Sequence, residues 1–161
     1  MSTNRLFYAR ALLVAGEMQR GPQYEQVLVA IMTGEDSTAY WNPLDTTLEC
    51  TGATPYNSFG PDGSWHVWNY PTAEVGIAQT LDTLRQPNMA RFYDAMKEPG
   101  KTASELAIAF AFTPWGGIGD KLPYEIVQEY VKAERNYVAD RRNHVFGEGP
   151  WPYRANGEPM G

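Results

Sequence analysis

The sequence predicts a mainly helical α+β domain, in which helices lie on both sides of a turn-rich lobe with a small hairpin. Apolar residues recur at three- and four-residue spacings in several separate segments, which is the pattern of amphipathic helices. Between positions 36 and 71 this period disappears, and Pro, Gly, Asn, Thr and aromatic residues take over. With 161 residues, the chain is long enough to bury one substantial core.

Two helices are expected before the lobe. The first covers 4–18 and is separated from the second by Gly21. The second begins at Pro22, a favoured first-turn residue, and its C-terminal end delivers Gly34 and Glu35 to the lobe. In the lobe, PDGS at 61–64 is a strong turn signal, so the flanking PYNSF and WHVWNY segments are expected to pair as a hairpin.

The later helices carry recognisable start and stop signals. Thr72 can cap a helix that ends before Pro87, and a shorter helix is expected over 88–97. Thr102 and Glu105 have the spacing of a capping box for the next helix. A long final helix is expected over 123–142, followed by an extended Gly- and Pro-rich tail that either frays or docks on a partner.

Composition excludes several classes of function. The net charge of -6 and the pI near 4.9 argue against nucleic acid as a partner, which requires clustered Lys and Arg. We see no signal peptide and no apolar stretch long enough for a membrane span. Cys50 has no partner for an intramolecular disulfide, and His66 and His144 lack zinc-site spacing. No phosphate-binding glycine loop is present, so we expect no cofactor and no metal.

Glu35 is the leading candidate for chemistry. It lies at the end of an apolar helix, where Met32, Tyr40 and Trp41 could desolvate it and raise its pKa, as a general acid near neutral pH requires. The adjacent Asp36 would act as a like charge in the same direction. The alternative is a solvated carboxylate that simply closes a helix, and spacing alone does not separate the two interpretations.

An ordered set of short motifs follows Glu35. They are NPL at 42–44, TT at 46–47, GAT at 52–54, YNS at 56–58 with Gly60, NYPT at 69–72, Gly76, Thr80, TL at 83–84 and PWG at 114–116. In this order they resemble a lysozyme-like domain found in phages of actinobacteria and in their hosts. The resemblance covers roughly 12–119, with Asp36, Ser37 and the longer PDGSWHVW segment as departures from it.

This resemblance implies a lysozyme-like helical domain over 1–119, with a cleft for peptidoglycan glycan strands. The C-terminal helix and tail over 120–161 lie outside the resemblance and are expected to be a docking extension. The resemblance also implies that Glu35 is catalytic and cleaves the bond between N-acetylmuramic acid and N-acetylglucosamine, as in lysozymes and lytic transglycosylases. The candidate substrate-binding residues are Trp41, Asn42, Thr47, Tyr56, Asn57, Tyr70 and Trp115. Because Asn, Ser and Thr also satisfy backbone groups in turns, a structural role for many polar lobe residues stays open, and Asn42 with Pro43 is expected to fix the loop.

Two questions of mechanism and role stay open. A single-carboxylate mechanism would use the substrate's own 6-hydroxyl or acetamido group, whereas a two-carboxylate hydrolase needs a second acid about 5 to 9 Å away, for which Asp45, Glu49 and Asp62 are unranked candidates. The rival function is a catalytically inactive structural virion protein, in the tail or capsid, that keeps the fold. The enzyme would act on the cell wall from the virion or, like an endolysin, in the host lysate, and the C-terminal tail could dock on other virion proteins.

Overall fold

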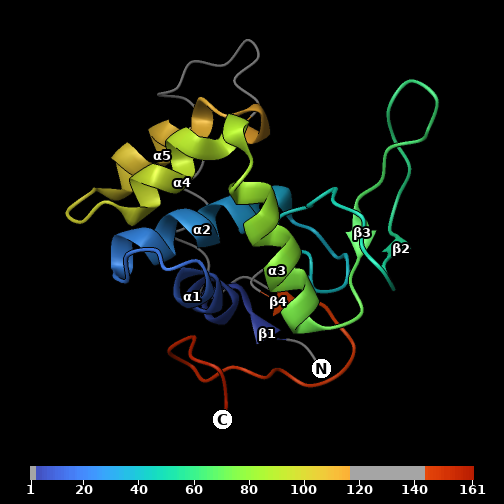
Figure 1. The fold of residues 1–161 in the computed structure, drawn as a ribbon, viewed down its shortest axis with the longest axis horizontal. Helices are drawn as coiled ribbons and strands as arrows, with labels where there is room; N and C mark the ends of the chain where they lie inside the picture. Colours follow the sequence, from blue (N-terminus) through green and yellow to red (C-terminus); the bar gives the residue numbers. More distant parts are fainter. Residues whose placement is uncertain (1–2, 117–143) are drawn as a thin grey trace.

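The computed structural model describes residues 3–116 and 144–161, which form five α-helices and two small antiparallel sheets (Figure 1). The helices are α1 (Arg5–Ala15), α2 (Pro22–Glu35), α3 (Ala73–Leu84), α4 (Ala90–Lys97) and α5 (Ala103–Ala111), with 3-10 turns η1 (Pro87–Met89) and η2 (Pro114–Gly116). The strands are β1 (Thr3–Asn4), β2 (Thr54–Pro55), β3 (Trp68–Asn69) and β4 (His144–Val145). No helix in the described ranges is long and apolar enough to cross a membrane. The mainly helical character expected from the sequence is confirmed.

The first two helices differ in how well the sequence predicted their ends. Helix α1 begins after Asn4, whose side chain accepts a hydrogen bond from the Phe7 amide at 2.9 Å. It ends at Ala15, with Gly16 as its C-cap, instead of continuing to Met18, because Glu17 adopts a left-handed conformation with φ of 53°. Helix α2 runs from Pro22 to Glu35 as predicted.

The caps predicted for the later helices are present. The Thr72 side chain accepts from the Val75 amide at 3.2 Å, and Thr102 with Glu105 forms the reciprocal capping box at the start of α5. Pro87 opens the separate turn η1, so the helix expected from Asn88 begins two residues later. The helix predicted over 123–142 lies outside the described residues.

The core is built around α2, which packs against both α1 and α5. Helices α4 and α5 lie side by side at one end of the molecule (Figure 1), and the Phe92 and Phe110 rings join them edge to face at 5.1 Å. The fully buried apolar side chains of these helices include Leu12, Leu28, Ile31, Met32, Phe92 and Phe110. This packing makes the C-terminal end of α2, where Glu35 lies, a rigid support for a site.

The lobe contains the predicted hairpin. Strands β2 and β3 pair with Thr54 opposite Asn69, and farther out Phe59 and Trp65 exchange backbone hydrogen bonds of 2.8 and 3.1 Å. At the tip, the Asp62 carboxylate accepts from both the amide and the hydroxyl of Ser64. Figure 1 shows the hairpin projecting from the helical body as an arm.

The C-terminal tail is extended, as predicted, but it packs on its own chain instead of fraying. Strand β4 pairs with β1, and the segment after it runs beside α1 (Figure 1). The Arg10 guanidinium donates to the Ala155 carbonyl at 3.2 Å, and a side chain on Gly157 would collide with the Arg10 carbonyl. One face of this tail is therefore occupied by the chain's own first helix.

Candidate functional site

Glu35 is the last residue of α2, and the chain turns away immediately after it. Asp36 adopts a left-handed conformation with φ of 48°, and its amide donates to the Met32 carbonyl at 2.9 Å. The Asp36 carboxylate accepts from Arg5 of α1 at 3.3 Å. The Asp36 carboxylate is thus paired with the Arg5 cation. It is not the like charge that the sequence suggested would raise the pKa of Glu35.

The carboxyl neighbour of Glu35 is Asp45, which a tight turn holds in place. The buried Asn42 amide donates to the carbonyls of Thr46 and Trp68, both at 2.9 Å, and its oxygen accepts from the Thr46 amide at 2.8 Å. Asn42 and Thr46 are therefore locked together, with Asp45 between them at φ of 55°. Of the three candidate second carboxylates, Asp45 is the one beside Glu35.

The two carboxyls are within hydrogen-bonding reach and share one electrostatic environment. Burial, together with the charge and the hydrogen bond of Asp45, raises the pKa of Glu35 to about 7. Burial also raises the pKa of Asp45, although hydrogen bonds from Ser37 and Glu35 act in the opposite direction. Because two adjacent carboxylates repel each other, the pair holds a proton near neutral pH, and Glu35 is the group that retains it.

Glu35 and Asp45 line a pocket of about 570 Å³, which we call the acid cleft. Four parts of the fold meet there: the end of α2 with its following turn, the hairpin, the end of α3 with η1, and η2. The remaining lining residues are Thr46, Thr47, Phe59, Trp65, Val67, Thr83, Gln86, Asn88, Met89, Pro114 and Trp115. The apolar walls supplied by Val67, Met89, Pro114 and Trp115 are the kind of surroundings that desolvate a carboxyl group.

Two buried polar atoms of the acid cleft lack hydrogen-bond partners within the described part of the chain. They are Oδ1 of Asp45 and Oγ1 of Thr46, whose residue is 1% exposed. Buried polar atoms in folded proteins nearly always have partners, so unpaired atoms at a pocket wall indicate where water or a ligand would bind.

Strained backbone is concentrated on the segment that carries the pair. Among the described residues, non-glycine positive φ values occur at Glu17, Asp36, Trp41 and Asp45, and the last three follow Glu35 within ten positions. Such conformations are costly and persist only where the surrounding structure enforces them. Here the enforcing contacts are the hydrogen bonds of Asn42 and the packing of Trp41.

The structure places three of the predicted substrate-binding residues, Trp41, Asn42 and Tyr70, in the interior, and none of them lines the acid cleft. All three are sealed in the interior: Trp41 and Asn42 have no exposed surface, and Tyr70 is 2% exposed. The Trp41 indole donates to the Glu148 carbonyl at 3.0 Å, and the Tyr70 hydroxyl donates to the Leu48 carbonyl at 2.7 Å. Their polar groups are used to hold the lobe together, which supports the expectation that Asn42 fixes the loop.

The other predicted binding residues are divided between the acid cleft and the hairpin. Thr47 and Trp115 line the acid cleft. Tyr56 and Asn57 are exposed on the hairpin but do not line the acid cleft. The Tyr56 hydroxyl lies 2.6 Å from the Thr38 hydroxyl, and the Asn57 side chain accepts from the Val67 amide at 3.0 Å, so both serve the hairpin.

The acid-cleft residues that sequence reasoning missed include Phe59, Trp65, Gln86 and Asn88. A signal for the first two was present, since an aromatic residue flanks each side of the predicted turn at 61–64 and a hairpin brings such residues together. Gln86 and Asn88 flank Pro87, where no pattern in the sequence indicates that a helix end faces the lobe.

Within the described ranges, no cluster of three or more His, Cys, Asp and Glu residues could hold a metal ion. Comparisons of the chain with protein-family models, with curated proteins and with solved structures found no match. The function of the site therefore has to be argued from its geometry.

Proposed function

We propose that the protein is a peptidoglycan glycosidase of the lysozyme or lytic transglycosylase type, in which Glu35 is the general acid on the MurNAc–GlcNAc bond. The observation that carries this proposal is the Glu35–Asp45 pair in the wall of an open cleft with apolar and aromatic sides. A carboxyl group that keeps its proton near neutral pH can donate it to a glycosidic oxygen.

The lining of the acid cleft suits an uncharged sugar. Thr47, Gln86 and Asn88 offer hydroxyl and amide groups for sugar hydroxyls, and the unpaired Oγ1 of Thr46 lies among them. Trp115 offers an aromatic surface of the kind on which pyranose rings pack. Among the described lining residues there is no Lys or Arg, so a phosphate or carboxylate ligand would find no counter-charge.

The closeness of Asp45 to Glu35 bears on the type of mechanism. In two-carboxylate glycosidases the acids lie about 5 to 9.5 Å apart, because the second must act on the opposite face of the sugar. Asp45 acts on Glu35 itself, through its charge and a hydrogen bond, so we do not assign it that role. Asp45 instead acts as a positioning residue that retains the Glu35 proton, which favours the single-carboxylate mechanism with attack by the substrate's own 6-hydroxyl or acetamido group.

The test is cleavage of purified actinobacterial cell wall, followed by turbidity and by release of soluble glycan. Glu35→Gln should lower the rate by at least about 100-fold and leave the circular dichroism spectrum unchanged, because the amide keeps the shape but has no acidic proton to transfer. The matched control is Glu74→Gln on the exposed start of α3, which should cleave like the wild type.

Full activity in Glu35→Gln would refute the assignment. Wall binding without cleavage by the wild type would favour the alternative, a catalytically inactive structural virion protein that retains the fold.

A further inference from the structure

A second hollow adjoins the acid cleft along the hairpin; we call it the outer hollow. Its volume is about 410 Å³, and its lining residues are Thr47, Glu49, Phe59, Ser64, Trp65, His66 and Trp68. Thr47, Phe59 and Trp65 line both spaces, so the two hollows border each other at these side chains. A glycan strand that is bound at the Glu35–Asp45 pair can therefore extend past Trp65 into the outer hollow.

We propose that the outer hollow is a further sugar-binding subsite, which takes an uncharged N-acetylhexosamine of the strand whose bond is cleaved at Glu35. This inference rests on the proposed function and extends it by one subsite on the same glycan strand. It assigns binding roles to Trp65 and His66, which the sequence analysis did not include among the site residues.

Trp65 supplies a fixed aromatic platform. Its side chain is 58% exposed, but its backbone is bonded to Phe59 in both directions, and the Phe59 ring meets it edge to face at 5.9 Å. A side chain on Gly60 would approach the Trp65 ring to 2.8 Å, so the glycine allows the indole to lie over the turn. A large exposed ring that is already held in place loses little entropy when it stacks on a ligand.

The polar groups of the outer hollow are mainly hydrogen-bond acceptors. The His66 Nδ1 lies 2.8 Å from the Asn57 carbonyl, so it must carry the proton and donate, which leaves Nε2 as an acceptor in the neutral ring. The Glu49 carboxylate is a second acceptor, and the Thr47 and Ser64 hydroxyls complete the set. Acceptors of this kind match the hydroxyl groups and the acetamido N–H of an N-acetylhexosamine.

Charge selects against acidic ligands. Glu49 is exposed and carries the negative charge of the outer hollow, and no Lys or Arg is among the described residues that line it. An anionic sugar, or a phosphate-bearing wall polymer, would meet repulsion there without a compensating cation. The uncharged N-acetylglucosamine unit of a glycan strand avoids this penalty.

The experiment measures binding of N-acetylglucosamine oligomers, from dimer to hexamer, to Glu35→Gln protein by calorimetry. Affinity should rise with length once an oligomer reaches the outer hollow. Because Trp65 also lines the acid cleft, Trp65→Ala in the same background should weaken all oligomers to some extent, but the longer ones about tenfold more than the shortest bound oligomer. Trp65→Phe should retain most of the gain with length.

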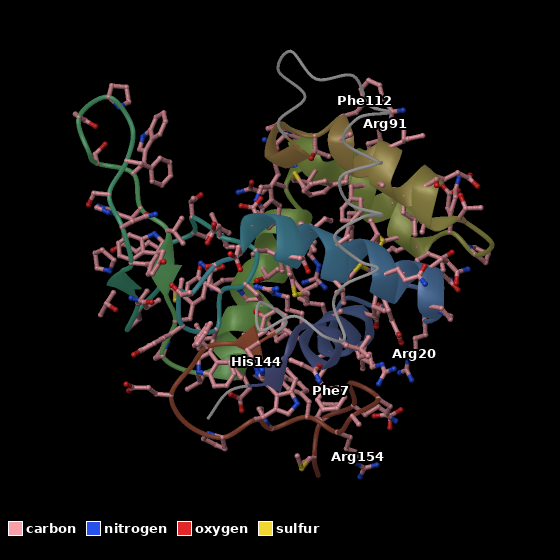
Figure 2. All side chains as sticks on the ribbon, turned by 180° about the vertical axis from the view of Figure 1, so that it is seen from behind. Phe7, Arg20, Arg91, Phe112, His144 and Arg154 are labelled. Atoms are coloured by element: carbon pink, nitrogen blue, oxygen red, sulfur yellow. The ribbon has the colours of Figure 1, made fainter. Side chains whose placement is uncertain are left out.

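The matched control for loss of an exposed ring is Phe112→Ala. Phe112 is 47% exposed and lies under Arg91, on the α4–α5 side of the molecule away from the hairpin (Figure 2). The Phe112→Ala variant should bind oligomers of all lengths as tightly as the Glu35→Gln parent does. A hexasaccharide of alternating N-acetylglucosamine and glucuronic acid tests charge: it should bind more weakly than the neutral hexamer, and Glu49→Gln should narrow the difference.

The subsite would be refuted if Trp65→Ala weakened binding equally at all oligomer lengths, or did not weaken it at all. It would also be refuted if no oligomer bound. Equal affinity for the anionic hexasaccharide would overturn its charge selectivity. Wall cleavage by the wild type reports separately on the proposed function, so cleavage without a length-dependent effect of Trp65 would leave the enzyme in place and remove only the subsite.

Discussion

The lobe contains two groups of aromatic and polar residues, one buried in the fold and one in the walls of the two hollows. Trp41, Asn42 and Tyr70 are buried, with their polar atoms bonded to backbone carbonyls. Trp65 and Thr47 also carry an aromatic and a polar side chain, yet they line the acid cleft and the outer hollow. A ring or amide in a turn-rich segment therefore identifies a site only when its polar atoms are not already used by the fold.

Trp41 holds the fold together with both its backbone and its ring. Its amide donates to the Phe146 carbonyl, its own carbonyl accepts from the Tyr8 hydroxyl, and its ring stacks on Trp151 at 6.1 Å. These partners come from α1 and from the C-terminal tail, more than a hundred positions away in the second case. Trp41 thus joins three parts of the chain beneath the turn that holds Asp45.

The largest expected effect is on stability, in Gly76→Ala. A Cβ at this position in α3 would lie 2.1 Å from the Trp41 carbonyl oxygen, which is backbone and cannot move aside. Alanine normally favours a helix over glycine by about 1 kcal/mol, but here we expect a loss of about 3 kcal/mol or more in the free energy of unfolding. Urea titration measures it. Trp65→Ala, in the exposed group, should change stability by no more than about 0.5 kcal/mol, and comparable losses in both would remove the distinction.

A smaller loss is expected from Asn42→Ala. It removes a buried amide with three hydrogen bonds and leaves backbone groups of Thr46 and Trp68 without partners, which should cost about 2 to 4 kcal/mol. Because the same bonds hold Asp45, wall cleavage should fall as well. The comparison is Asn57→Ala, whose exposed side chain makes one backbone bond and should cost about 1 kcal/mol or less. If Asn42→Ala were as stable as Asn57→Ala, the loop-fixing role would be wrong.

Trp151→Ala should have a still smaller effect, about 2 kcal/mol, because this tail residue is only partly buried. Its ring contacts Trp41, Tyr8 and Tyr153, so its loss should loosen the tail from the fold. Hydrogen exchange should then increase in 144–161 and around Trp41 while α4 and α5 stay protected. Unchanged exchange at Trp41 would show that the tail does not support the lobe.

Much of the fold could be predicted because its signals are local. The caps at Thr72 and Thr102, the proline at the start of α2 and the turn at 61–64 each act within a few residues. The pairing of β1 with β4 and the packing of the tail on α1 could not be predicted, since they join the two ends of the described chain. No periodicity in a Gly- and Pro-rich segment indicates which surface it will cover.

The candidate site divides in the same way. Glu35 could be found because a carboxylate closing an apolar helix is visible in the sequence, whereas its partner Asp45 could not be ranked above Glu49 and Asp62. Asp36 is adjacent in sequence but faces Arg5, and Asp45 reaches Glu35 only because Asn42 folds the loop back. The burial of Trp41 depends on contacts with the distant tail, so the position of Trp41 in the lobe sequence does not predict that it is buried.

An NMR titration of the Glu35 carboxyl carbon, in the wild type and in Asp45→Asn, measures directly whether this pair holds a proton. We predict a pKa near 7 in the wild type, against an ordinary value of 4.5. In Asp45→Asn the pKa should be lower, because the like charge and its hydrogen bond are gone, but still above the ordinary value, because burial remains. A Glu35 that titrates near 4.5 in the wild type, or whose pKa Asp45→Asn leaves unchanged, would contradict the central claim that this pair holds a proton for catalysis.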